Sequence, residues 1–199
     1  MDLADLIDHD PIDLDKIATF LDELHHEGRV AAIRSLSGKQ QARLFDAADG
    51  YRKISLEDFV PPCAGELEEI VHHGKNSLPA ASLFEKRFTR PPAGHVTTEI
   101  WGYNHQPMKT YTGPGYFVAY ELPESGEVLI DYTRTPPAGA PLPDGWPKII
   151  PNSKRLSRFI YNGTQDVMRG VSEHVTVGRA SRDGEPMPNY FALCRTSKH

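Results

Sequence analysis

The sequence predicts an α+β protein in which an N-terminal helical segment packs on a C-terminal antiparallel β-sheet or small β-barrel. Apolar residues recur at helical spacing within residues 1–75, whereas within residues 95–199 they alternate with polar residues as in half-buried strands. Short turn-forming sequences separate the strand-like segments, which favours antiparallel pairing because parallel strands need long crossover connections. At 199 residues, the two segments fit one integrated globular domain with its own core.

Residues 13–28 form the clearest predicted helix. Ile17 and Leu21 recur at helical spacing, Asp13 is suited to the N-cap, and Gly28 is suited to the C-terminal end. Further helices are expected at residues 28–36, 38–50 and 65–73, with a short one within residues 79–88 of the transitional segment 75–94. The apolar stripes are one-sided, so we expect these helices to pack on the sheet.

The second part of the chain contains six strand-like segments. They are residues 95–104, 115–122, 127–134, 156–163, 165–181 and 189–196. The segment 165–181 is too long for one flat strand, and Gly170 or Ser172 would supply its bend. These strands could close as a small barrel or remain a strongly curved sheet. An unclosed sheet would leave edge strands that a second copy could pair with, so a homodimer is open.

Charge and hydropathy limit the classes of partner and the compartment. The formal net charge is −5, and long basic clusters are absent, which disfavours nucleic acid and anionic membranes as partners. The charge is uneven, with −9 in residues 1–70 and +4 in residues 71–199. Apolar runs are too short to cross a bilayer, and the acidic start lacks the pattern of a secretion signal. We therefore expect a cytoplasmic protein without membrane or nucleic-acid partners.

No familiar motif assigns a cofactor, a metal or a nucleophile. The Gly-Pro-Gly at residues 113–115 precedes a predicted strand, whereas a phosphate-binding loop needs a following helix. The histidine pairs at residues 25–26 and 72–73 are expected at helix C-termini, where imidazolium favours the helix dipole, so no metal site is predicted. Cys63 and Cys194 lack a nucleophile context and are expected to be reduced structural residues. The cofactor stays unknown.

Strand alternation predicts a small-molecule pocket. Within residues 127–134, Tyr132 and Arg134 share a face with aliphatic residues, whereas Asp131 and Thr133 lie on the other face. An apolar surface with a few orienting polar groups is typical of ligand pockets. The expected ligand is small and anionic or amphipathic, with Arg134 as the anion contact. The expected ligand-binding residues are Arg134, Tyr132, Tyr116, Tyr161, Trp101 and Trp146.

A proline-rich segment follows the predicted strand at residues 127–134. Residues 135–153 contain six prolines and one aromatic anchor, Trp146. Proline stiffens a connection that glycine and serine would leave flexible. We expect this segment to fold over one end of the sheet, either as the cap of a pocket or as a plug of the core.

Two other classes of function compete with ligand binding. The first is an enzyme in the same cavity, with His174 as general acid and base assisted by Asp131 or Tyr132. The second is a protein-interaction module that uses the N-terminal helices and has no pocket. A cavity reached by His174 would favour the enzyme, whereas a solidly filled sheet face would favour the interaction module.

Overall fold

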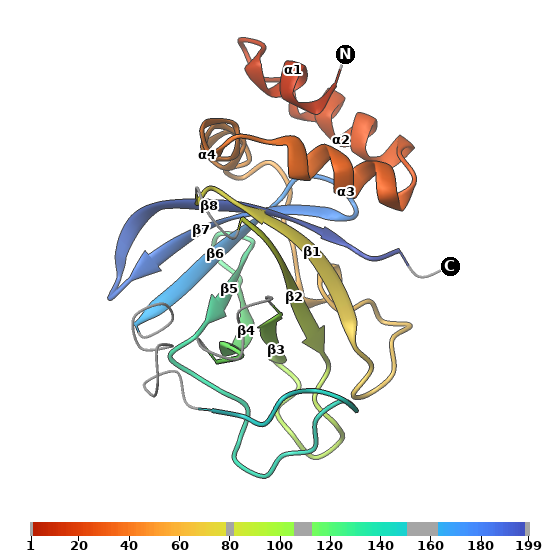
Figure 1. Ribbon diagram of the computed structural model, residues 1–199, viewed down its shortest axis with the longest axis vertical. Helices are drawn as coiled ribbons and strands as arrows, with labels where there is room; N and C mark the ends of the chain where they lie inside the picture. Colours follow the sequence, from red (N-terminus) through yellow and green to blue (C-terminus); the bar gives the residue numbers. More distant parts are fainter. Residues whose placement is uncertain (1, 79–81, 106–112, 151–162, 198–199) are drawn as a thin grey trace.

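The computed structural model describes residues 2–78, 82–105, 113–150 and 163–197, where four α-helices precede an antiparallel barrel of eight strands (Figure 1). The helices are α1 (Leu3–Asp8), α2 (Leu14–Glu23), α3 (His26–Ser35) and α4 (Gly38–Ala47). A short 3-10 helix, η1 (Leu56–Asp58), leads into the barrel. The strands are β1 (Ile70–Asn76), β2 (Leu83–Thr89), β3 (Ile100–His105), β4 (Tyr116–Leu122), β5 (Glu127–Asp131), β6 (Thr164–Gly170), β7 (Val175–Arg182) and β8 (Glu185–Arg195).

The barrel follows the simplest closed topology. Each strand pairs antiparallel with the next one in the sequence, and β8 returns to pair with β1. Closure gives every described strand two partners and leaves no edge of the kind that would favour pairing with a second copy. The predicted fold class is therefore confirmed, and the closed barrel is the form that the sheet takes.

The helices begin where the sequence places their caps. The Asp13 carboxylate accepts a hydrogen bond from the Lys16 N–H at 3.1 Å, and the Ser37 hydroxyl accepts one from the Gln40 N–H at 3.3 Å. Such caps satisfy N–H groups that the first helical turn leaves without partners. Gly28 differs from the expectation, because α2 already ends at Glu23 and Gly28 lies inside α3.

The helical layer covers one side of the barrel, with α3 and α4 against β7, β8 and β1 (Figure 1). Leu21, Ile33 and Leu44 from the helices and Val175 and Ala192 from the strands are all fully buried in this contact. We call this cluster the outer core. It uses the one-sided stripes that the helical periodicity predicts, because each stripe needs a partner surface to leave water.

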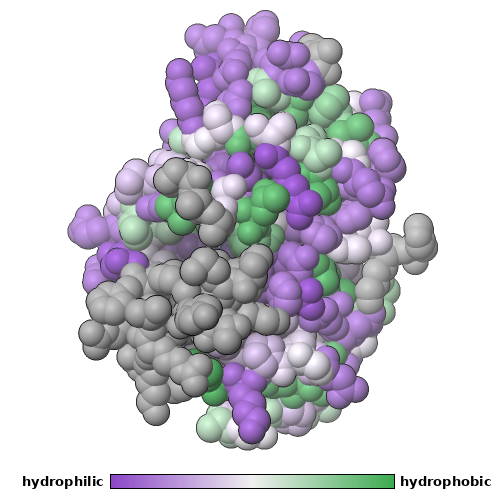
Figure 2. Space-filling model, in the orientation of Figure 1, coloured by the Kyte–Doolittle hydropathy of each residue, from purple (hydrophilic) through white to green (hydrophobic). Residues whose placement is uncertain are grey.

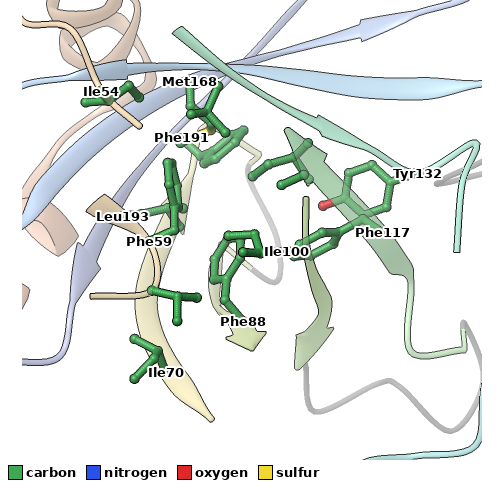
Figure 3. Close-up of a cluster of buried hydrophobic side chains, with 14 of the residues drawn as sticks. Ile54, Phe59, Ile70, Phe88, Ile100, Phe117, Tyr132, Met168, Phe191 and Leu193 are labelled. Carbon is green, nitrogen blue, oxygen red and sulfur yellow. The ribbon is translucent and has the colours of Figure 1, made fainter. Parts of the chain in front are cut away.

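A second cluster, the inner core, fills the barrel itself (Figure 3). The segment before β1 closes one end of the barrel, because Phe59 enters it and lies 5.2 Å, centroid to centroid, from Phe88 of β2. The Ile54 N–H donates to the Gly126 carbonyl oxygen at 2.9 Å and ties this segment to the β4–β5 turn. The opposite end carries the β1–β2, β3–β4 and β7–β8 connections.

Two expected helices are strands. Residues 70–76 form β1 rather than the end of a helix, and residues 83–89 form β2 rather than a helix. In both strands alternate residues are buried, and the buried positions include His72 and Lys86. A histidine and a lysine on the inward face interrupt the apolar alternation that marks a strand. The barrel therefore begins at Ile70, well before residue 95.

Candidate ligand-binding site

Three glycine–phenylalanine pairs shape the interior of the barrel. In each pair an inward-facing glycine lies directly opposite a phenylalanine of the next strand. The pairs are Gly74 with Phe84, Gly102 with Phe117, and Gly178 with Phe191. A Cβ atom on any of these glycines would lie only 2.4 to 2.6 Å from the opposite ring. The glycines thus leave room for three aromatic rings to lie across the interior.

The three rings surround a buried ammonium group, that of Lys86 in β2. Its Nζ lies 4.9 Å from the ring centroids of Tyr132 and Phe191, 5.3 Å from that of Phe117 and 5.7 Å from that of Phe84. The electron-rich ring faces attract a cation, and they do so more strongly when water is excluded. Lys86 itself is only 2% exposed.

Polar partners for the ammonium come from three other strands or their ends. Nζ lies 2.9 Å from Oδ2 of Asp166 in β6, donates to Oδ1 of Asn104 in β3 at 3.2 Å, and donates to the Tyr132 hydroxyl just after β5. Nδ2 of Asn104 also donates to the Tyr132 hydroxyl, at 2.8 Å. Because β2 and β6 lie four strands apart in the ring of eight, the long lysine stem spans the interior. We call these four residues the Lys86 cluster.

Burial controls the protonation of the interior groups. It lowers the pKa of Lys86, and the neighbouring Asp166 carboxylate opposes that shift. It also lowers the pKa of His72, the residue paired with Lys86 across β1 and β2, to about 3. The His72 Nε2 lies 3.0 Å from the Phe59 carbonyl oxygen, which can only accept, so this nitrogen carries the proton of a neutral ring.

Access to the Lys86 cluster differs between the two ends of the barrel. On one side Phe59 and Phe88 are completely buried and close the interior. On the other side Phe84 and Phe191 are 9% and 6% exposed, and their ring centroids lie 5.9 Å apart in an edge-to-face contact. This pair of rings is therefore less completely buried than Phe59 and Phe88.

The structure places one predicted ligand-binding residue in the Lys86 cluster. Tyr132 points its hydroxyl into the barrel beside Phe117 (Figure 3). Its backbone N–H donates to the Thr164 carbonyl at 3.2 Å, so the pairing with β6 continues one residue past the end of β5. Tyr161 lies outside the described residues.

Three other predicted residues lie on the outer surface of β3 and β4. Trp146 packs against Tyr116, with ring centroids 6.1 Å apart, and its Nε1 donates to Oε2 of Glu69 at 2.6 Å. The Tyr116 hydroxyl donates to the Pro147 carbonyl at 2.6 Å. The described part of the proline-rich segment thus covers the outside of the barrel rather than entering it. Trp101 is also buried there, beside His95.

Arg134 and Asp131 are engaged with neighbours outside the barrel interior. The Arg134 guanidinium donates to Oε2 of Glu99 at 2.6 Å and lies over the ring of Tyr120. Oδ1 of Asp131 accepts from the backbone N–H and the hydroxyl of Thr133 at 2.8 and 2.6 Å. Each charged group is thus held by nearby residues on the outside of the barrel, away from the Lys86 cluster.

His174 lies in the turn between β6 and β7, at the contact with the helices. Burial lowers its pKa, with the nearby Arg29 and Arg195 guanidiniums as further causes. Its Nε2 lies 3.7 Å from Oε1 of Glu173, and the Glu173 N–H donates to Asp22 of α2. The position of His174 is on the outer-core side, so the structure does not bring it together with Tyr132 or Asp131.

The apolar stripes of the helices are occupied by the barrel and by one another. On the face shown in Figure 2, the end of the molecule formed by α1 and α2 is mainly hydrophilic. A partner-binding role for the helices would find most of their apolar stripes already buried.

A separate cleft of about 460 Å3 lies between η1 and the loops before β3 and after β4. Three of its four charged residues have partners within the protein, and the fourth, Glu57, is exposed. Arg90 donates to the Ala64 carbonyl at 2.6 Å, Glu99 accepts from Arg134, and Glu121 accepts from the Leu56 N–H at 3.0 Å. These contacts hold η1 and the loops on the barrel.

Within the described ranges, no helix is long and apolar enough to span a membrane. The same residues include no group of three or more histidine, cysteine, aspartate or glutamate side chains that could hold a metal ion. No protein-family model, curated protein or solved structure matches the chain. Functional inference therefore depends on the geometry of the barrel.

Sequence reasoning missed Lys86, Asn104 and Asp166, although one signal was present for Lys86. Lys86 lies midway between Phe84 and Phe88, which makes it a charged residue on an apolar strand face. Such a lysine is almost never fully buried without partners. Asn104 becomes visible only with the β2–β3 register, which pairs it with Lys86, and Asp166 only when the barrel closes and brings β6 opposite β2.

Proposed function

We propose that the protein binds a small amphipathic molecule inside the barrel, with its polar end at the Lys86 cluster and its apolar part against the phenylalanine rings. The observation that carries the proposal is a lysine, 2% exposed, held by Asp166, Tyr132 and Asn104 at the centre of an aromatic interior. Ligand pockets have this composition, with mostly apolar walls and a few polar groups that fix orientation.

Stability alone does not account for the Lys86 cluster. A buried ion pair is often no more stabilising than apolar residues of the same volume, because both charges lose their hydration. A barrel of eight strands can be filled by apolar side chains, or it can hold one small ligand. A buried ionisable group with a shifted pKa and a specific charge partner is a recognised indicator of function.

The charge balance favours a neutral polar end on the ligand. Asp166 already neutralises the ammonium of Lys86, so a carboxylate would place a second anion beside a single cation. A carbonyl or hydroxyl oxygen can instead accept a hydrogen bond from Lys86 or Tyr132 without adding charge. Of the two expected ligand types, we therefore propose the amphipathic one rather than the anionic one.

The route that we propose for the ligand passes between Phe84 and Phe191. These are the least completely buried members of the ring set around Lys86, at 9% and 6% exposure, whereas Phe117 is fully buried. Phenylalanine rings can move by rotating about their side-chain torsions without breaking a hydrogen bond. The ligand would replace their contact with each other by contacts with its own apolar chain.

Three ten-carbon probes test this proposal. Decanol, decanoate and decylammonium have a neutral, an anionic and a cationic polar end, respectively, and a ligand that binds the folded state raises its melting temperature. We expect decanol to stabilise the protein most and decylammonium least. The result would be checked by differential scanning calorimetry and by isothermal titration.

The matched variants are Lys86→Met/Asp166→Leu in the barrel and Lys39→Met on the exposed surface of α4. Replacing both members of the ion pair removes the polar end of the site without leaving an unpaired buried charge. We expect the barrel variant to lose the preference for decanol and the Lys39 variant to keep it. Equal binding by all three proteins, or no binding by any, would contradict the proposal.

A further inference from the structure

We infer that Lys86 forms an imine with an aldehyde or ketone bound in the barrel, with Tyr132 and Asp166 as its proton-transfer partners. This inference rests on the proposed function, because the carbonyl compound must first enter the site. It names the class of ligand and adds a covalent step. The three residues lie in direct contact, because the Lys86 Nζ donates hydrogen bonds to both the Tyr132 hydroxyl and Oδ2 of Asp166.

Lysine attacks a carbonyl carbon only as the neutral amine. A buried site surrounded by aromatic rings favours the neutral amine, and burial lowers the pKa of Lys86. Asp166 lies 2.9 Å from Nζ and can take up the proton that the ammonium loses. Lys16 and Lys39 are exposed on the helices, so neither combines a dry site with an adjacent acid.

The step balances with these groups alone. The Lys86 ammonium gives one proton to Asp166, and the resulting amine forms a C–N bond as the carbonyl π bond breaks. Tyr132 relays a proton from nitrogen to oxygen and produces the neutral carbinolamine. Asp166 then returns its proton to the carbinolamine hydroxyl, the C–O bond breaks and water leaves. The product is a protonated imine paired with the Asp166 carboxylate, so charge is conserved.

The geometry also suits the product. The protonated imine keeps one positive charge at the position of Nζ, where four ring faces and Asp166 now hold the ammonium. The carbonyl oxygen would start within reach of the Tyr132 hydroxyl. Asn104 donates to that hydroxyl at 2.8 Å, which fixes its position. No further oxidant or cofactor is required.

Reductive trapping tests the imine directly. The protein would be incubated with decanal and cyanoborohydride, which reduces an imine to a stable secondary amine. Peptide mapping by mass spectrometry would then locate the added alkyl group. We expect the peptide that contains Lys86 to carry the main label, and the label to disappear in Lys86→Arg and in Lys86→Met/Asp166→Leu. The Lys39→Met variant should be labelled at Lys86 to the same extent as the unmodified protein.

Tyr132→Phe separates a reactive lysine from one that is merely accessible. Removing the proton relay should slow trapping about 100-fold, the low end of what general acid–base groups contribute. Binding of decanol to the same variant, with folding checked by circular dichroism, shows whether the site itself survives. Unchanged trapping in a folded Tyr132→Phe variant would overturn the role of Tyr132.

The outcomes also separate this inference from the proposed function. Decanol binding that depends on Lys86, without decanal trapping at Lys86, would overturn the imine and leave the proposed function standing. Absence of both decanol binding and decanal trapping would overturn the proposed function and the imine together. Equal labelling of Lys86 and the exposed lysines in the unfolded protein, with no labelling of Lys86 in the folded protein, would also overturn the imine.

Discussion

The two cores of this protein differ in the kind of residue that they bury. The outer core, between the helices and β7 and β8, is mainly aliphatic, with Leu21, Ile33 and Val175 at 0% exposure. The inner core is rich in phenylalanine and encloses the ion pair of Lys86 and Asp166. Both cores exclude water, but the inner one does so around a paired ammonium and carboxylate.

This difference separates packing from function. An aliphatic core of ordinary density gains stability in proportion to the apolar area that it removes from water. The inner core could gain stability in the same way if its four polar positions held apolar residues. It contains Lys86, Asp166, Tyr132 and Asn104 instead. The inner core is therefore the part of the molecule where we expect chemistry, and the outer core is the part where we expect stability alone.

The largest predicted effect comes from breaking the ion pair on one side only. Lys86→Met leaves Asp166 buried without its cation, which should lower the free energy of unfolding by about 3–5 kcal/mol. The double variant Lys86→Met/Asp166→Leu removes both charges and should recover most of this loss. Guanidinium unfolding of Lys86→Met, Asp166→Leu and the double variant measures the coupling between the two positions.

Leu21→Ala in the outer core is the matched control for the ion-pair variants. It should cost a similar amount, about 2–5 kcal/mol, by leaving a cavity. Unlike Lys86→Met, it should not change decanol binding. Additive losses at Lys86 and Asp166 would show that the ion pair has no energetic coupling.

A smaller effect should follow from His72 as the pH falls. Its folded-state pKa of about 3 lies below the ordinary value of 6.5, so the unfolded chain binds more protons between these values. Stability due to neutral His72 is thus complete above pH 6.5 and is lost as the pH falls towards 3. The loss should be roughly 3 kcal/mol at pH 4.

His72→Phe isolates this contribution from that of the carboxylates, which also titrate at low pH. Phenylalanine does not titrate and can pack against Phe59 and Phe88, which already contact the imidazole ring. Between pH 7 and pH 4, the free energy of unfolding of the unmodified protein should fall by roughly 3 kcal/mol more than that of His72→Phe. Parallel pH profiles would show that His72 does not titrate between folded and unfolded states as described.

The smallest predicted effect concerns the glycines that make room for the rings. Gly102→Ala would place a Cβ 2.4 Å from the Phe117 ring and 2.6 Å from the Arg87 carbonyl oxygen. Overpacking of this kind typically costs about 1–3 kcal/mol. Because Phe117 faces Lys86, decanol binding should weaken as well. Thermal unfolding and calorimetric titration measure the two effects.

Gly28→Ala in α3 is the control for Gly102→Ala. The atoms nearest to the new Cβ would be those of the exposed His25 ring, at 3.0 Å, and of the Leu24 side chain. Alanine favours a helix interior over glycine by up to about 1 kcal/mol, so this variant should be slightly more stable. A destabilised Gly28→Ala beside an unaffected Gly102→Ala would reverse the predicted ranking of the two positions.

The sequence predicted those parts of the fold that depend on local periodicity. The stripe with Ile17 and Leu21 and the cap at Asp13 identified α2, and the break near Gly170 separates β6 from β7 as expected. These signals need only neighbours in the chain. The strands β1 and β2 were missed because their inward faces carry His72 and Lys86, and partners from distant strands make those residues acceptable there.

The candidate site was less accessible to sequence reasoning because it depends on register. Alternation was read correctly within β4 and β5, but β5 ends at Asp131, so Arg134 does not share the inward face of Tyr132. Alternation also does not say which face of β4 matches which face of β5. The turn at residues 123–126, with Gly126 at a φ of 72°, pairs Ala119 with Ile130. Tyr132 therefore faces the interior with Phe117, while Tyr116 faces outward. The cytoplasmic location stays a prediction.

The central claim is that the interior around Lys86 receives a ligand. Nuclear magnetic resonance of protein with isotope-labelled lysine tests it most directly, because the Lys86 side-chain signal can be assigned by its loss in Lys86→Met/Asp166→Leu. Titration with decanol should shift the Lys86 signal to saturation and leave the exposed lysines unchanged. A Lys86 signal that stays fixed at every decanol concentration, in a protein that remains folded, would contradict the claim.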